Sequence, residues 1–214
     1  MTEHVLIDPE LDRRLQRDGF VVAPLIDAAT ASGLRSAYLD RVGVHDDRLL
    51  SDMQVDDIEY RRWAAQELRQ GLDGPTAALF VDHRPFMRHF LAQFPGDNSG
   101  SDVQRDWMWV DERAHERSYV VWVALEDITG HNGQLRVIRG SHRLDGMLRG
   151  ADLTAPWLAH EGVLEDRLLA VPLEAGQCVV LDGALVHASY PNHTDVPRVA
   201  AVLATRRVGA GLVH

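Results

Sequence analysis

The chain has 214 residues, 45% of them hydrophobic, which is enough for one well-packed domain and too few for two ordinary ones. The formal net charge is −10 and no run of basic residues stands out, which argues against nucleic acid as a partner. No apolar stretch is long enough to span a bilayer, and the N-terminus lacks a signal-peptide pattern, so we expect a cytoplasmic protein without membrane contact.

Two residue types limit the chemistry that is open to the chain. Lysine is absent and every cationic residue is arginine, which excludes Schiff-base and P-loop lysine mechanisms. The one cysteine, Cys178, lies in an apolar run over residues 178–181. It can form neither an intrachain disulfide nor a cysteine-based metal site, and we predict a buried hydrophobic residue rather than a reactive thiol.

The N-terminal part is predicted to begin with two helices separated by a strand. Leu11 and Leu15 have i, i+4 spacing and are closed by Gly19, which predicts a short first helix. Residues 20–22 are predicted to be a strand, and Asp27 to cap a second helix that ends near residue 40.

Two further helices are predicted before the character of the chain changes. Residues 58–70 form the first and residues 75–94 the second, which starts after Gly74-Pro75 and is kinked or broken by Pro85. His83 and His89 would then be surface or helix-packing residues. The sequence from 95 to 101 is rich in glycine, serine, proline and aspartate, and is the clearest loop.

Beyond this loop the pattern is that of β-structure. Short apolar or alternating segments bounded by glycine and proline predict strands at 119–125, 135–138, 178–181 and 199–203. Helices followed by short antiparallel strands indicate a mainly β fold with flanking helices. We expect a single domain over residues 1–214, with a helical buttress mostly in 1–95 and a β core mostly in 101–207.

Polar residues in the β part could converge on one cavity. Positions 104 and 106 would face the same way at a strand end, and His187 follows a strand and a turn that could bring it in from the opposite sheet. Two imidazoles and one carboxylate would leave three open positions on an octahedral ion, but position 104 is Gln104 rather than histidine. Arg198 begins the next strand, where its guanidinium could hold a carboxylate.

Several short motifs recur in a characteristic order and spacing from about residue 16 to residue 205. They are residues 18–22, 106–107, 122–127, 132–135, 140–143, Gly176, 187–189 and 197–198. Together they resemble the phytanoyl-CoA dioxygenase-like family of iron(II)- and 2-oxoglutarate-dependent oxygenases. The resemblance implies a double-stranded β-helix, also called a jelly roll, of the cupin-like kind.

The resemblance also implies roles for individual residues. Asp106 and His187 would bind iron(II), and Arg198, assisted by Ser189, would bind the far carboxylate of the cosubstrate 2-oxoglutarate. Gln134 lies where the family often has a polar contact to the cosubstrate. The first metal histidine of the family falls on Gln104, whose neutral amide oxygen is a weaker iron(II) ligand than imidazole.

Other candidate residues have simpler interpretations. Four histidines outside the motif are expected to be solvated or to stabilise turns, although a long loop could fold the first of them over the cavity: His115, His131, His142 and His193. Trp107, Trp109 and Trp122 are expected to be core or pocket-wall aromatics, with substrate contact as the alternative for the first two. Arg136 is expected on a solvated strand face, with an anion-binding role in the pocket as the alternative.

Three functions fit these observations. The first is an oxygenase that oxidises, and most simply hydroxylates, a small organic or natural-product-pathway molecule. The second is a catalytically silent ligand-binding homologue that could pair with an active one, and the third is a metal-dependent non-oxidative isomerase or cyclase. Apolar edge strands would suit a homodimer. Residues 146–165 and 46–57 are the candidate lids.

Overall fold

The computed structural model describes residues 4–42, 49–144 and 161–213. The helices, including short 3-10 turns labelled η, are α1 Pro9–Asp18, α2 Ala28–Arg41, η1 Asp52–Gln54, α3 Ile58–Ala77, η2 Glu112–Ala114, η3 Ser141–Arg143 and α4 Glu161–Glu165. The strands are β1 Phe20–Pro24, β2 Leu49–Ser51, β3 His83–Gln93, β4 Ser101–Gln104, β5 Ser118–Ala124, β6 Leu135–Val137, β7 Leu169–Val171, β8 Gln177–Asp182, β9 His187–Ser189 and β10 Arg198–Arg207.

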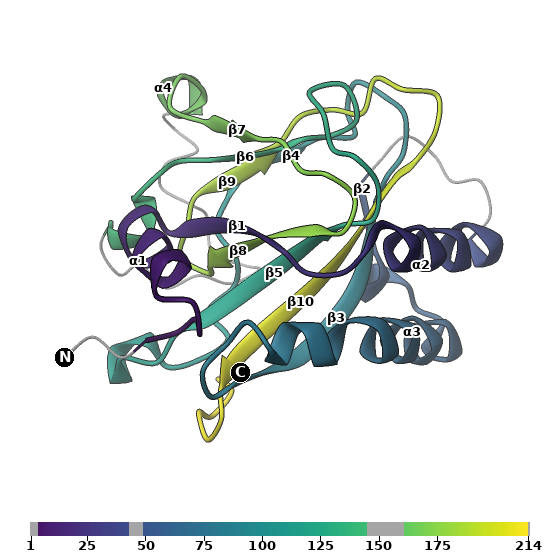
Figure 1. Ribbon diagram of the computed structural model, residues 1–214. Helices are drawn as coiled ribbons and strands as arrows, with labels where there is room; N and C mark the ends of the chain where they lie inside the picture. Colours follow the sequence, from purple (N-terminus) through teal and green to yellow (C-terminus); the bar gives the residue numbers. More distant parts are fainter. Residues whose placement is uncertain (1–3, 43–48, 145–160, 214) are drawn as a thin grey trace.

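The described strands form two antiparallel sheets that face each other. The larger has six strands in the order β1-β8-β5-β10-β3-β2, and the smaller has four in the order β4-β9-β6-β7. In Figure 1 the smaller sheet lies above the larger one, and α2 and α3 lie alongside the larger sheet at its other side. This is the predicted mainly β, double-stranded β-helix architecture with flanking helices.

Both faces of the central strand β5 are covered, and this strand therefore has no solvent-exposed side. On β5, Val121 and Val123 pack in the cluster that contains the helix residues Leu68 and Leu72. Trp122, one position along, belongs instead to the cluster beneath the smaller sheet. Because successive side chains of a strand point to opposite faces, every residue of β5 is buried.

The structure corrects the helix predicted over residues 75–94. Helix α3 continues through Pro75 to Ala77, and His83–Gln93 is the strand β3, which pairs with β10 and β2. Pro85 lies where the register between β3 and β10 shifts, opposite Thr205, a place that tolerates a residue without an N–H. The first 95 residues therefore hold three strands of the larger sheet besides the helices.

The other N-terminal predictions are confirmed. Helix α1 ends at Gly19, which has a left-handed φ of 82° and donates its N–H to Leu15 O. Asp27 caps α2 by accepting from the Thr30 N–H at 2.7 Å.

The prediction of a buried cysteine is also confirmed. Cys178 is buried in β8, and burial raises the pKa of its thiol to about 12. Residues 46–48 and 146–160 of the two candidate lids lie outside the described residues.

Candidate active site

A cavity of about 210 Å³ lies between the two sheets. Strands of both sheets and the segment that follows β4 supply its walls. Its lining residues are Leu49, Met53, Met87, His89, Leu91, Ser101, Gln104, Arg105, Asp106, Trp107, Trp109, Val120, Trp122, Gly133, Leu135, Leu181, His187, Ser189, Arg198 and Val202. The cavity therefore brings together five of the six site residues predicted from the sequence.

The predicted metal ligands meet at one end of the smaller sheet. Gln104 ends β4 and is the Cα partner of His187 on β9. Asp106 follows two residues later and lines the same cavity. An amide, a carboxylate and an imidazole thus come from two adjacent strands and the segment that continues one of them.

A hydrogen bond to the backbone fixes the orientation of the His187 ring. Its Nδ1 lies 3.0 Å from the carbonyl oxygen of Leu185. Because a carbonyl oxygen only accepts, Nδ1 must be the donor, which leaves Nε2 as the ring nitrogen that faces other partners. A carbonyl on the second nitrogen is the usual way in which proteins orient a metal-binding histidine.

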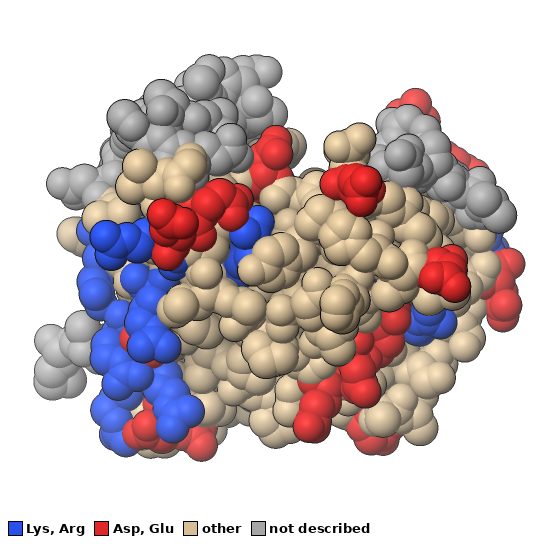
Figure 2. Space-filling view, turned by 90° about the horizontal axis from the view of Figure 1, so that it is seen from above, with Lys and Arg blue, Asp and Glu red and all other residues tan. Residues whose placement is uncertain are grey.

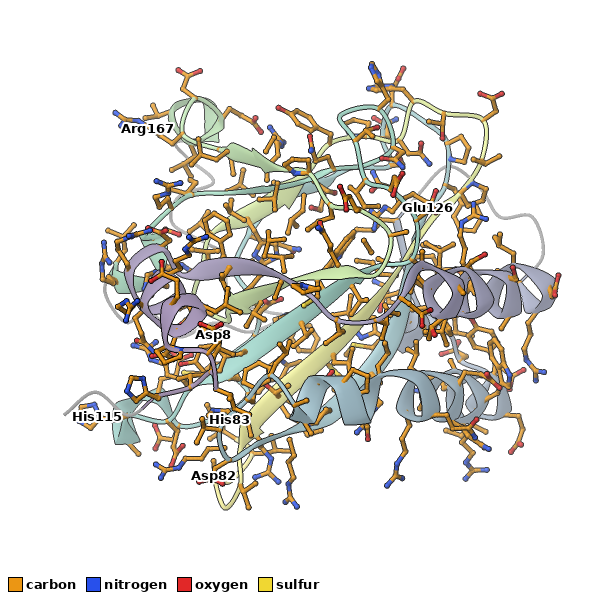
Figure 3. All side chains as sticks on the ribbon, viewed as in Figure 1. Asp8, Asp82, His83, His115, Glu126 and Arg167 are labelled. Carbon is orange, nitrogen blue, oxygen red and sulfur yellow. The ribbon has the colours of Figure 1, made fainter. Side chains whose placement is uncertain are left out.

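No other histidine replaces the missing one within residues 4–42, 49–144 and 161–213. Those ranges contain no group of three or more His, Cys, Asp or Glu side chains placed to hold a metal ion. His115, the candidate for a loop folded over the cavity, lines a separate surface pocket with His83 and Asp82. Figure 3 labels these three residues at the lower left of the molecule, away from the smaller sheet. The Nε2 atom of His142 lies 3.1 Å from the carbonyl oxygen of Gln16 instead. The residues that could hold a metal in this cavity are therefore Gln104, Asp106 and His187.

Arg198 is a buried cation with spare hydrogen-bonding capacity. It is 1% exposed at the start of β10, and its guanidinium lies 5.1 Å from the centre of the Trp122 ring. Its Nη2 donates to Gln93 Oε1, whereas Nε and Nη1 have no partner among the described residues. Burial lowers its pKa to about 10, so the side chain is cationic at pH 7.

The glutamine that contacts Arg198 is Gln93, a residue that the sequence reasoning missed. Gln93 is fully buried on β3, accepts from Arg198, and donates through Nε2 to Tyr190 O at 2.6 Å. Gln134, the predicted cosubstrate contact, is also buried but is not among the residues that line the cavity. Neighbouring Gly133 lines it instead. Gln93 was overlooked because β3 was predicted to be helical.

Gly133 is required by this arrangement. Its φ is +81°, and a Cβ atom there would lie 2.1 Å from Gln93 Oε1. We expect Gly133→Ala to destabilise the fold by about 1–3 kcal/mol through backbone strain, and to displace Gln93 from Arg198. Denaturant unfolding measures the first effect. Gly130→Ala is the matched control, because its nearest neighbour is Gln134 Oε1 at 3.8 Å, and an equal loss in both variants would contradict the prediction.

Ser189, on β9, is the residue that was predicted to assist Arg198. Its Oγ accepts from the Ser101 N–H at 2.9 Å and lies 3.1 Å from Ser101 Oγ. The hydroxyl therefore joins β4 to β9 and also lines the cavity, close in sequence to His187. It can still rotate to donate to a bound carboxylate.

His89 is a second lining residue that the sequence reasoning missed. It is 8% exposed on β3, and its Nδ1 has no hydrogen-bond partner among the described residues. Burial lowers the pKa of the ring to about 4, so it is neutral at pH 7. The prediction of a surface or helix-packing histidine was wrong for His89.

Aromatic side chains form part of the cavity wall, as predicted. Trp107 and Trp109 both line it, with ring centroids 5.3 Å apart, and Trp107 is 45% exposed.

The predicted solvated position of Arg136 was wrong. Arg136 is buried, pairs with Glu165 and stacks over the Tyr190 ring at 4.2 Å, outside the cavity.

Charged side chains are unevenly placed on the surface seen from above. Arginines gather at the left edge of the face in Figure 2, on the side where α1 lies, while the centre of that face carries few charges. On α1, Arg13 and Arg14 pair with Glu10, and Arg17 pairs with Asp18. These ion pairs neutralise much of the local positive charge. No described helix has the length and apolarity to cross a membrane.

Two facing sheets that enclose an imidazole, a carboxylate and a buried arginine define a double-stranded β-helix domain with a built ligand cavity. The sequence model of phytanoyl-CoA dioxygenase matches residues 15–200, and the chain belongs to the phytanoyl-CoA dioxygenase family. Phytanoyl-CoA dioxygenase domain-containing protein 1 of Danio rerio is 36% identical over 117 residues, covering 51% of this chain and 40% of that protein. The match spans less than half the length of the curated relatives found.

Solved structures share the fold at low sequence identity. The epimerase SnoN, crystallised with Fe3+, alpha ketoglutarate and nogalamycin RO, is 21% identical with a TM-score of 0.65, covering 96% of this chain and 85% of SnoN. HygX from Streptomyces hygroscopicus, with nickel and 2-oxoglutarate bound, is 17% identical with a TM-score of 0.64, covering 95% and 88% of the two chains.

The cavity has groups that suit a keto acid and a metal ion. Arg198 offers two unpartnered nitrogens in a dry environment, which fits a carboxylate. His187 and Asp106 are ligands suited to a divalent transition metal, and Gln104 can add only a neutral amide oxygen. The residues therefore fit both groups, with a weaker metal site than two imidazoles and a carboxylate would make.

Proposed function

We propose that this protein is a cytoplasmic iron(II)- and 2-oxoglutarate-dependent oxygenase that oxidises, most simply by hydroxylation, a small organic molecule. The observation that carries the proposal is the buried Arg198, with Nε and Nη1 unpartnered, in one cavity with Asp106 and His187. A buried guanidinium with unpartnered nitrogens is costly, and the attraction of Glu126 offsets only part of the effect of burial, so a site that keeps such a group is suited to an anionic ligand. Family membership supports the same activity.

In this proposal five residues that line the cavity, and the neighbouring Gln93, have defined roles. Asp106 and His187 would hold the metal, with Gln104 as a weak third donor. Arg198 and the Ser189 hydroxyl would hold the distal carboxylate of 2-oxoglutarate, and Gln93 would fix the guanidinium by accepting from Nη2. Bound metal and 2-oxoglutarate would supply the activation of oxygen that is coupled to decarboxylation of the keto acid.

The surroundings of Arg198 would strengthen its contact with the cosubstrate. Trp122 covers one face of the guanidinium, and Val120 and Leu181 add apolar surface to the cavity. Water is thereby kept from the ion pair, and charge interactions in such a site are stronger than in solvent. The same exclusion of water would protect a reactive centre from side reactions.

A binding assay tests the proposal before any substrate is known. Purified protein, mixed with iron(II) and 2-oxoglutarate without oxygen, should develop a visible charge-transfer absorption that needs both additions. On admission of oxygen it should form succinate slowly even without substrate. If neither signal appears at millimolar 2-oxoglutarate, the oxygenase proposal fails.

A second candidate is a homologue that binds ligands without turnover. It is favoured by Gln104 and by the lack of a third His, Cys, Asp or Glu ligand in the described part of the chain. Such a protein would bind 2-oxoglutarate through Arg198 without iron, which shows as a rise in melting temperature with the keto acid alone.

Gln104→His separates the two candidates. Imidazole is a stronger donor than an amide, and residue 104 lies opposite His187, so we expect the variant to bind Fe(II) or Mn(II) at least about tenfold more tightly. Equilibrium dialysis without oxygen measures this, with Gln104→Leu as the control that removes the amide. Should the parent already bind as tightly as the histidine variant, Gln104 belongs to a complete site and the silent candidate loses its support.

A further inference from the structure

His89 lies in an otherwise apolar part of the cavity wall. Its neighbours on the same face of β3 are Met87 and Leu91, and its Cα partner on β10 is Val202. All three line the cavity together with His89. A polar ring at such a position is unusual, because buried polar groups normally have hydrogen-bond partners.

The ring of His89 has unused hydrogen-bonding capacity. Its Nδ1 is fully enclosed and has no hydrogen-bond partner in the described part of the chain. Because burial lowers the pKa of the ring to about 4, His89 is neutral at pH 7 and offers one donor and one acceptor. A leucine would fill the same space without leaving these groups unsatisfied.

The rest of the cavity limits what could bind to this ring. Leu49, Met53 and Met87 supply aliphatic and thioether surface, and Trp107 and Trp109 supply aromatic surface. Two cations line the cavity in the described residues. Arg198 is assigned to the cosubstrate, and Arg105 donates through Nη2 to Ser141 O at 3.0 Å. Neither is therefore assigned to an anionic substrate.

We propose that His89 is a substrate-recognition residue that exchanges a hydrogen bond with the hydroxyl or carbonyl group of a small, uncharged and otherwise apolar substrate. The volume of about 210 Å³ supports the small size, since drug-sized ligands occupy pockets of roughly 300–1,000 Å³. The proposal rests on the proposed function only in treating the ligand as a substrate. Its test does not require turnover.

The test compares two probes that differ in one hydroxyl group, 1-indanol and indane. Their dissociation constants are measured by ligand-observed NMR, with protein alone and with protein that holds Mn(II) and 2-oxoglutarate under nitrogen. The preference for 1-indanol over indane should be about five- to tenfold greater in the parent than in His89→Leu.

Two further variants guard against misfolding and unspecific effects. His89→Gln keeps a donor and an acceptor and should retain most of the preference. Met87→Leu changes a neighbouring lining residue without removing a hydrogen-bonding group, and it should leave the preference at the parent value.

The outcomes distinguish this inference from the proposed function. An equal preference in the parent and His89→Leu would overturn the role of His89, as would a parent that binds neither probe. If 2-oxoglutarate fails to bind but the preference of the protein alone still depends on His89, the oxygenase proposal falls and the recognition role stands.

Discussion

Replacing Arg198 by methionine should abolish the binding of 2-oxoglutarate without weakening the protein itself. Removing one partner of a buried, hydrogen-bonded charge pair costs about 2–5 kcal/mol, which corresponds to roughly a 30- to 4,000-fold loss of affinity. The parent, with 2-oxoglutarate at one hundred times its dissociation constant, should gain about 2.7 kcal/mol of stability. The variant should gain less than about 0.9 kcal/mol.

Without 2-oxoglutarate, the Arg198→Met variant should be as stable as the parent or more stable. Burial lowers the pKa of Arg198 to about 10 from its higher usual value, so its charge disfavours the folded state at pH 7 by about 3 kcal/mol. Methionine has no charge to bury and can pack against Trp122, at the cost of the hydrogen bond to Gln93. The free variant should therefore be at least as stable as the free parent.

The measurement is a thermal or denaturant unfolding curve of each protein with and without 2-oxoglutarate. Arg206→Met is the control, because Arg206 lies on the same strand β10 but does not line the cavity. It should keep the full stabilisation by the keto acid. An Arg198→Met protein that is stabilised as much as the parent would show that 2-oxoglutarate does not bind at this arginine.

The part of the site on β4, β9 and β10 was predictable because its residues stand at fixed offsets from recognisable strands. Residues 104 and 106 share one side of an extended segment, His187 follows a turn, and Arg198 begins a strand after Pro197. These relations depend only on spacing along the chain, and that spacing is the same however the two sheets pack. The cavity brings these residues together accordingly.

The wall formed by β3 was not predictable in the same way. Phe90 and Ala92 face the helices while His89 and Leu91 face the cavity, so both sides of β3 are largely apolar. A strand buried on both faces shows no alternation of polar and apolar residues, and it cannot be told from a buried helix by periodicity. His89 and Gln93, which depend on this strand, were missed for that reason.

Gln134 shows a different limit. Its neighbour Gly133 lines the cavity, but the left-handed backbone of Gly133 and its close approach to Gln93 are tertiary facts. A motif gives the position along the chain, whereas the side chain that reaches the ligand depends on which strand packs opposite. Gln93 lies on β3, far from β10 along the chain, but the two strands pair in the larger sheet and Gln93 is the Cα partner of Arg198.

Asp52 should make the stability of the protein fall as pH rises from about 4 to 7. This carboxyl group is 2% exposed in η1, and it accepts from Tyr60 Oη and from the Phe90 N–H, each at 2.7 Å. Burial raises its pKa from 3.8 to about 6, although both hydrogen bonds lower it. Asp52 thereby fixes β3 next to His89 and precedes Met53 of the cavity wall.

The sign follows from proton linkage. Between the unfolded pKa of 3.8 and the folded value of about 6, the folded protein binds the proton more tightly. Stability from this group is therefore complete below about pH 4 and is lost as pH rises through 6, by about 3 kcal/mol in total. The lowered pKa values of His83, His89 and His142 act in the opposite direction, because stability is lost when these groups must be protonated.

Asp52→Asn isolates the carboxyl from the histidines. The amide can accept from Phe90 and donate to Tyr60 but does not titrate, so the difference in unfolding free energy between variant and parent contains only the Asp52 contribution. Between pH 4.5 and 7.5 that difference should change by about 2 kcal/mol in favour of the variant. Denaturant unfolding at several pH values measures it, and a constant difference would refute the assignment.

Tyr60→Phe provides the complementary test. It keeps the ring, which lies 5.6 Å from the Trp63 ring, and removes only the hydroxyl that lowers the pKa of Asp52. The folded pKa of Asp52 should then rise above about 6, and the loss of stability should extend to higher pH than in the parent. Opposite shifts in two variants, both centred on one carboxyl, are not expected from a general effect of acid on the fold. They would show that the wall carrying His89 and Met53 is held by a proton-sensitive contact.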